Sequence, residues 1–168
     1  MSLMTATPYK INNMELKNRI IMLVMHTAFA KGGKLSEEDY AFFEARAKGS
    51  PAAITQVAGV NDEGTADSMP NVTDESFFDA EKRITDMIHS YGTKHIVQLF
   101  HRGRNAASDK GLKPIAPSNV PSGIYRNECE VMTAEKIKET VKAFADAALK
   151  LKEIGVDAVE VSMSAGYL

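Results

Sequence analysis

The chain has 168 residues, of which 44% are hydrophobic and 25% are charged. This balance is typical of a folded globular protein and excludes a disordered or collagen-like chain. The formal net charge of −2 provides no overall positive field for binding nucleic acid or an anionic membrane. Because Cys129 is the single cysteine, an internal disulfide and a cysteine-built metal cluster are excluded within these residues.

The sequence has no recognisable secretion signal or membrane span. The first ten residues mix polar side chains with Pro8 and lack the apolar run of a signal peptide. The longest apolar run, residues 20–25, is too short to cross a bilayer. We expect residues 1–3 to be a short leader before Met4, and we expect a cytoplasmic protein with no membrane partner.

Signals for strands and helices alternate along the chain. The apolar run 20–25 predicts a strand that is buried on both faces. Ser36, with acidic residues after it, predicts a helix start, and Pro51 predicts that this helix ends near Gly49. The further predicted elements are a strand at 52–60, a helix at 77–91, a strand at 95–100, a helix beginning at Thr133 and a strand at 157–161.

Apolar residues at helical spacing predict which side of each helix faces the core. In the first helix these residues are Tyr40, Phe43 and Ala47. In the second helix they are Phe77, Ile84, Ile88 and Tyr91. In the third helix they are Ile137, Val141, Phe144, Ala148 and Leu151.

This order of elements predicts an α/β fold with a parallel sheet and right-handed crossovers. No glycine-rich dinucleotide or phosphate-loop fingerprint follows a predicted strand, which favours a (β/α) barrel over a doubly wound sheet. A complete barrel needs about 250 residues and eight strands. We therefore expect residues 1–168 to be a single domain, the N-terminal half of a (β/α)8 TIM barrel. The long connection 102–132 either caps a site or is a surface excursion.

Polar residues follow the predicted strands, at the edge where barrels carry their catalytic groups. Gln98 lies in an apolar strand, where its amide needs a partner. That partner could be backbone or the polar edge of a flat heteroaromatic ligand. His26 and His101 could be acids, ligands or satisfied core histidines. Because they lack a third ligand at zinc spacing, we expect no metal.

Three further side chains are left with two interpretations each. The phenol of Tyr167 is protonated at neutral pH, so it could donate a proton or simply pack. Arg102 and Arg104 could contact a phosphate or carboxylate, or lie on the surface.

Several short motifs occur in one order along nearly the whole chain. They are residues 16–20, Met25-His26-Thr27, residues 97–104, Ala116-Pro117-Ser118, residues 155–161 and Gly166-Tyr167-Leu168. Together they resemble the Old Yellow Enzyme family of NADH:flavin oxidoreductases. The Met-His-Thr motif is similar to the branch of the 2,4-dienoyl-CoA reductases.

The resemblance implies FMN as cofactor, NADH or NADPH as reductant, and hydride transfer to an activated C=C bond of a small unsaturated substrate. The flavin would be contacted by Leu23, Val24, Met25, His26, Val57 and Gln98. Tyr167 would be the catalytic proton donor. The expected substrate-binding positions are His101, Ser162 and Ala165. At the last two, many members of the family have histidines, so the resemblance leaves the substrate class open.

Other interpretations remain open from the sequence. The chain could be a non-catalytic half-barrel that works only as a homo-oligomer or a binding module. It could also belong to a flavin-free lyase or isomerase that uses His26 and His101.

Overall fold

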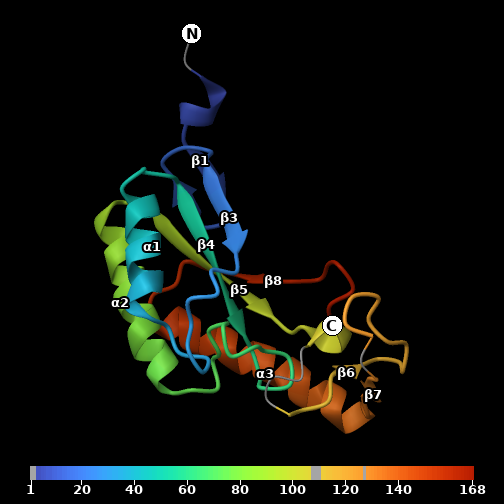
Figure 1. Cartoon of the computed structure of the whole chain (residues 1–168). Helices are drawn as coiled ribbons and strands as arrows, with labels where there is room; N and C mark the ends of the chain where they lie inside the picture. The colour runs from blue at the N-terminus through green and yellow to red at the C-terminus, as the bar shows by residue number, and fades with distance from the viewer. Residues whose placement is uncertain (1–2, 107–110, 127) are drawn as a thin grey trace.

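A computed structural model describes residues 3–106, 111–126 and 128–168, and its centre is a four-stranded parallel sheet (Figure 1). Parts of the expected leader and of the connection 102–132 lie outside the described residues. The strand order is β3 (Ile21–Met25), β4 (Ala53–Gly59), β5 (Lys94–Phe100) and β8 (Ala158–Val161). The helices are α1 (Glu37–Ala47), α2 (Ser76–Ser90) and α3 (Ala134–Glu153). The predicted alternation of strands and helices is confirmed.

Short elements close the two ends of the sheet. At one end a 3-10 turn (η1, Met4–Ala6) precedes a hairpin of β1 (Tyr9–Ile11) and β2 (Met14–Leu16). Leu16 is buried against Ala53 and Ile96. At the other end lie the C-terminus and a small parallel pair (Figure 1). The elements at this end are η2 (Gly103–Asn105), β6 (Ile115–Ala116) and β7 (Glu130–Val131).

The starts of α1 and α3 follow from side-chain caps. The Ser36 hydroxyl accepts a hydrogen bond from the Asp39 N–H, and the Asp39 carboxylate accepts one from the Ser36 N–H, so the predicted capping box is confirmed. The Thr133 hydroxyl accepts from the Lys136 N–H at the start of α3. None of the described helices has the length and apolar character that a bilayer crossing requires.

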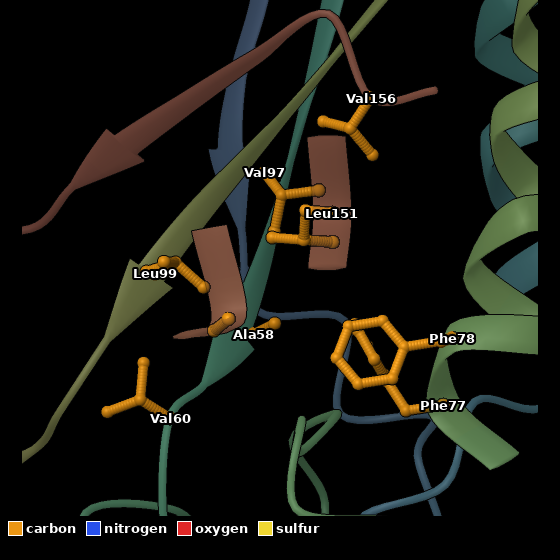
Figure 2. Packing of buried hydrophobic residues seen from close by; sticks show 9 residues of the cluster. Ala58, Val60, Phe77, Phe78, Val97, Leu99, Leu151 and Val156 are labelled. Carbon is orange, nitrogen blue, oxygen red and sulfur yellow. The ribbon is translucent and has the colours of Figure 1, made fainter. Parts of the chain in front are cut away.

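The main core lies between the sheet and the helices. Figure 2 shows Val97 and Leu99 of β5 pointing towards Leu151 of α3, with Phe77 and Phe78 of α2 beside them. A second cluster holds α1 and α2 on β4. The predicted inward residues that are buried in these clusters are Phe43, Ala47, Phe77, Ile84, Ile88 and Leu151. Those that are partly buried are Tyr40, Tyr91, Phe144 and Ala148.

The predicted inward face of α3 is wrong at its N-terminal end. The side chains of Ile137 and Val141 are 47% and 64% exposed, whereas Thr140 and Ala147 are buried. The physical reason is that the contacts of α3 with β5 and β8 bury Thr140 and Ala147 and leave Ile137 and Val141 outside.

The prediction that the strand at 20–25 is buried on both faces is also wrong, because β3 lies at the edge of the sheet and exposes Leu23 and Met25. Val161 of β8 is exposed on the other edge strand. The sheet therefore has the open, apolar edges of a partial barrel.

Candidate active site

The sheet presents one face to the helices and the other to a cavity. Strand register places Val57 beside Gln98 and Gln98 beside Glu160, so these three share a face, while Gln56 and Val97 face the helices. A cavity of about 510 Å³ lies at the carboxyl ends of the strands on the first face. Its lining residues are Val24, His26, Val57, Ala66, Ser68, Met69, Gln98, Phe100, Arg102, Tyr125 and Tyr167.

About half of the expected site residues meet at this cavity. The expected residues that line it are Val24, His26, Val57, Gln98 and Tyr167. Those that do not line it are Leu23, Met25, His101, Ser162 and Ala165. The cavity is thus built from β3, β4 and β5, from the loops that follow them and from the turn after β8.

The residues outside the cavity have local reasons for their positions. Leu23 and Met25 flank Val24 on an edge strand and are exposed, because alternate side chains of a strand point in opposite directions. The backbone N–H of Ser162 donates to the carbonyl of Leu99 at 3.1 Å. Ala165 adopts a left-handed φ of 56° in the turn that follows β8.

His101 is a buried supporting residue. Its Nδ1 accepts a hydrogen bond from the Gly103 N–H at 2.9 Å, which fixes the turn after β5. Burial lowers the pKa of His101 to about 4, and the charge of Lys136 adds to this effect, so the ring is neutral at pH 7. Since His26 lines the cavity and His101 does not, the structure does not bring the two histidines to one site.

Gly64 is needed where the chain passes over the His101 ring. A Cβ atom at residue 64 would lie 2.4 Å from Cγ of His101, whereas one at Gly123 would meet nothing within 4 Å. We expect Gly64→Ala to lower the free energy of unfolding by about 1–3 kcal/mol through overpacking, measured by urea denaturation. Gly123→Ala is the matched control, and equal effects of the two substitutions would contradict this role of Gly64.

The side chain of Gln98 has a partner on the next strand. Its Nε2 donates to Oε1 of Glu160, across the β5–β8 pairing. The amide is therefore satisfied by a side chain and not by backbone. Gln98 still forms part of the cavity wall beside Val57. Among the described lining residues that belong to the strands, Gln98 is the polar one.

Tyr167 is held at the cavity by a turn after β8. Its ring packs edge-on against Phe100, with ring centroids 4.5 Å apart. The Gly166 carbonyl accepts hydrogen bonds from Arg104 Nε and Asn105 Nδ2, each at 3.3 Å. Gly166 has a φ of 71°, a left-handed conformation that glycine adopts without strain. These contacts place the phenol over the end of β5.

Sequence reasoning missed the contributions of two loops. Ser68 and Met69 belong to the loop after β4, and the Ser68 carbonyl lies 3.0 Å from Nε2 of His26. Tyr125 comes from the long connection after β5. The available signal was that loops after barrel strands carry sites. Periodicity does not tell which residue of an irregular loop turns back to the sheet.

The cavity suits a flat heteroaromatic ring. Its walls are apolar at Val24, Val57, Met69 and Phe100, and the Gln98 amide offers a donor and an acceptor at one side. Small-molecule sites commonly combine such apolar walls with a few placed polar groups. The donor set therefore fits a flavin ring.

Comparison with known families identifies the chain. The model of the NADH:flavin oxidoreductase / NADH oxidase family matches residues 6–168. The chain belongs to this family. The cofactors of this family are FMN and a nicotinamide nucleotide. The family identification agrees with the resemblance stated from the motifs.

Curated relatives cover the same segment. A metal reductase of Desulforamulus reducens is 35% identical over 164 residues, which are 96% of this chain and 25% of that protein. An NADPH dehydrogenase of Bacillus subtilis is 33% identical over 166 residues, 96% of this chain and 48% of that protein. The chain thus spans a quarter to a half of the length of these relatives.

Solved structures agree on the fold. The complex of 2-naphthoyl-CoA reductase with 2-naphthoyl-CoA has a TM-score of 0.93 and 26% identity, covering 98% of this chain and 28% of that protein. The Old Yellow Enzyme homologue from Zymomonas mobilis has a TM-score of 0.88 and 23% identity, covering 98% and 49%. The predicted fold class is confirmed: the chain forms part of a TIM barrel.

Proposed function

We propose that residues 1–168 form the N-terminal, flavin-ring half of an FMN-dependent oxidoreductase that passes hydride from NADH or NADPH to an activated C=C bond of a small unsaturated substrate. The observation that carries this proposal is the convergence of Val24, Val57, Gln98 and Tyr167 on one cavity. FMN, when bound, supplies the hydride chemistry, and the protein orients the reactants.

Each of these side chains has a task in the proposed site. Val24 and Val57 give the ring apolar walls that exclude water. The Gln98 amide binds the polar edge of the ring and fixes its orientation. Tyr167 holds a proton at its hydroxyl, at the mouth of the cavity, for delivery to the substrate carbon.

The open edges of the sheet need a cover in the working protein. Leu23 and Val161 are 75% and 52% exposed on the two edge strands. We propose that the remaining strands of the barrel cover these two edges. The alternative is that a second copy of this chain covers them, and the experiment below tells the two arrangements apart. The working enzyme acts in the cytoplasm in this proposal.

An FMN titration of the 168-residue chain tests the ring site. We expect weak binding, because only part of a barrel surrounds the ring, and about tenfold weaker binding for Gln98→Leu, which loses a hydrogen bond. Glu160→Ala removes the partner of Gln98 and leaves its amide available, so it should not weaken FMN binding. Flavin fluorescence quenching measures all three affinities.

The outcomes separate the proposals. Equal affinities of wild type and Gln98→Leu would contradict the assigned contact, and no binding at millimolar FMN would contradict the ring site. A stoichiometric flavin band, together with a dimer in native mass spectrometry, would show that a second copy covers the open edges.

A further inference from the structure

A cluster of polar side chains is buried on the helix side of the sheet, away from the cavity. Its members are Gln56 of β4, Glu81 and Thr85 of α2, and His95 of β5. Within the described part of the chain, three atoms of this cluster have no hydrogen-bond partner: Oε1 of Gln56, Oε1 of Glu81 and Nε2 of His95. A buried polar atom without a partner is costly, so these three atoms indicate a contact that the heavy atoms alone do not show.

The Thr85 hydroxyl determines which ring nitrogen of His95 carries the hydrogen. The hydroxyl donates to the carbonyl of Glu81 at 2.8 Å, one turn earlier in α2, and lies 3.0 Å from Nδ1 of His95. Because a hydroxyl has a single hydrogen, which the Glu81 carbonyl accepts, its oxygen must accept from Nδ1–H of His95. In a neutral ring Nε2 is then an acceptor without a hydrogen. The Thr85 contact therefore assigns the Nδ1–H tautomer to His95.

The acceptor nitrogen of His95 faces an oxygen that also has no partner. Oε1 of Glu81 lies 3.6 Å from Nε2 of His95, while Oε2 of Glu81 accepts from Nε2 of Gln56 at 2.6 Å. Two acceptors cannot satisfy each other, but one proton on Oε1 makes the contact O–H···N. The separation is longer than a formed hydrogen bond and too short for a bridging water, so a small rotation of a protonated carboxyl group is what fits.

The charged groups that act on this pair have partners of their own. Asp39 of α1 disfavours a negative charge on Glu81 and is engaged in the cap of its own helix. His89 of α2 disfavours a positive charge on His95, Asp157 favours one, and these two groups contact each other at 2.6 Å. Burial raises the pKa of Glu81 and lowers the pKa of His95, which favours the same neutral pair.

We propose that Glu81 and His95 form a buried proton-binding site, in which one proton on Oε1 of Glu81 is donated to Nε2 of His95. Together with the contact of Gln56, this proton fastens α2 to both β4 and β5. The opposite face of these two strands carries Val57 and Gln98, so the site supports the cavity from behind. The site uses none of the cavity residues and is independent of the function proposed above.

NMR of the 15N-labelled 168-residue chain at about pH 6 tests the tautomer, with His101 as the internal reference. His101 is also buried, but its Nδ1 accepts from the Gly103 N–H, so its hydrogen lies on Nε2. We expect a pyrrole-type nitrogen shift at Nδ1 and a pyridine-type shift at Nε2 in His95, and the reverse in His101. We also expect a low-field proton resonance with cross-peaks to the His95 ring hydrogens next to Nε2. These signals are assigned by their loss in His95→Gln.

Two substitutions test the hydroxyl and the proton separately. Thr85→Val removes the acceptor of Nδ1–H, so the ratio of the Nε2–H to the Nδ1–H tautomer of His95 should rise about tenfold. Thr140→Val is the matched control, because Thr140 is a buried residue of α3 whose hydroxyl donates to a carbonyl one turn earlier in the same way. Glu81→Gln keeps an N–H donor towards Nε2, so it should keep the tautomer and lose the low-field resonance.

Each result supports or overturns the proposal. Hydrogens on both ring nitrogens of His95 would show an ion pair with an ionised Glu81 and would overturn it. The same tautomer in His95 and His101 would overturn it as well, and so would an unchanged tautomer ratio in Thr85→Val. A low-field proton without cross-peaks to the His95 ring would assign the carboxyl proton to Oε1 of Gln56 instead.

Infrared spectroscopy covers the case in which fast exchange hides the low-field proton. A protonated carboxyl group has a carbonyl band that an ionised one lacks. We expect this band in the wild type at about pH 6 and its loss in Glu81→Gln. A wild-type spectrum without the band would show that Glu81 is ionised and would overturn the proposal.

Discussion

The free energy of unfolding of this chain is expected to be highest near pH 6.5, to fall as the pH rises towards 8 and to fall as the pH drops towards 3. Three buried groups cause this profile: Glu81 of α2 and His95 of β5, which are fully buried on the helix side of the sheet, and His101, whose pKa burial lowers to about 4. Burial, with a contribution from Asp39, raises the pKa of Glu81 from 4.5 to about 8, against the hydrogen bond from Gln56. Burial lowers the pKa of His95 from 6.5 to about 3. Both groups are neutral in the folded chain at pH 6.

The sign follows from the protons that each state binds. Above pH 6.5 the unfolded chain has released the Glu81 proton while the folded chain keeps it, so stability falls as the pH rises towards 8. Below pH 4.5 the unfolded chain protonates His95 while the folded chain does not, so stability falls as the pH drops towards 3. Between these values the effects of Glu81 and His95 cancel, and His101 leaves a rise of about 1.4 kcal/mol per pH unit up to pH 6.5. Above pH 6.5 the stability falls by about 1.4 kcal/mol per pH unit.

The contacts around Glu81 make a glutamine variant informative. Gln56 Nε2 donates to Glu81 Oε2 at 2.6 Å, and Glu81 Oε1 lies 3.6 Å from His95 Nε2. In Glu81→Gln the side-chain oxygen can accept from Gln56, and the new amide can donate towards His95. We expect this variant to lose the alkaline limb, so that its stability rises up to about pH 6.5 and then stays level.

Urea unfolding at a series of pH values measures these profiles. Glu75→Gln is the matched control, because Glu75 is an exposed glutamate beside the same helix. Its profile should follow the wild type. Parallel profiles of wild type and Glu81→Gln would show that Glu81 does not carry the alkaline limb. His95→Gln should lose its part of the acid limb, so that the stability is level between about pH 4.5 and 6.5 in the same measurement, because the effects of His101 and Glu81 then cancel.

This buried pair also marks what the sequence could and could not predict. Strands were predictable where apolar residues run together, as at 20–25, and helix starts where a cap precedes acidic residues, as at Ser36. The sequence also contains a pattern that indicates the burial of Glu81. Glu81 is four residues after Phe77 and three before Ile84, so it lies on the apolar face of α2. A charged residue at such a position indicates a buried polar contact.

The position of site residues depended on contacts that are distant in sequence. Gln98 was predictable because it is a polar residue near the carboxyl end of a buried strand, whereas Val57 was expected from the family resemblance. Tyr125 was not, because its place depends on Ser122 reaching Asn105 across the fold. The exposed Ile137 and Val141 show the same limit: spacing finds an apolar face but not whether a neighbour covers it.

Tyr167→Phe is expected to slow substrate reduction in the full-length flavoprotein by about a hundredfold or more, the usual contribution of a positioned general acid. Phenylalanine keeps the edge-on contact with Phe100, so the substitution removes the hydroxyl and little else. Reduction of the flavin by NADH or NADPH should stay within about twofold, because that step does not use the proton on Tyr167. Stopped-flow absorbance of the flavin measures the two half-reactions separately.

The comparison of half-reactions separates a catalytic hydroxyl from a structural one. Tyr91→Phe is the control, because the Tyr91 hydroxyl bonds to Glu44 and does not line the cavity. Equal losses in both half-reactions of Tyr167→Phe would indicate that the hydroxyl supports the site and does not deliver the proton. A loss confined to the oxidative half-reaction, with pH dependence altered in that half alone, is what a proton donor requires. Because Arg104 and Asn105 hold the turn through the Gly166 carbonyl, the aromatic ring stays in place in either case.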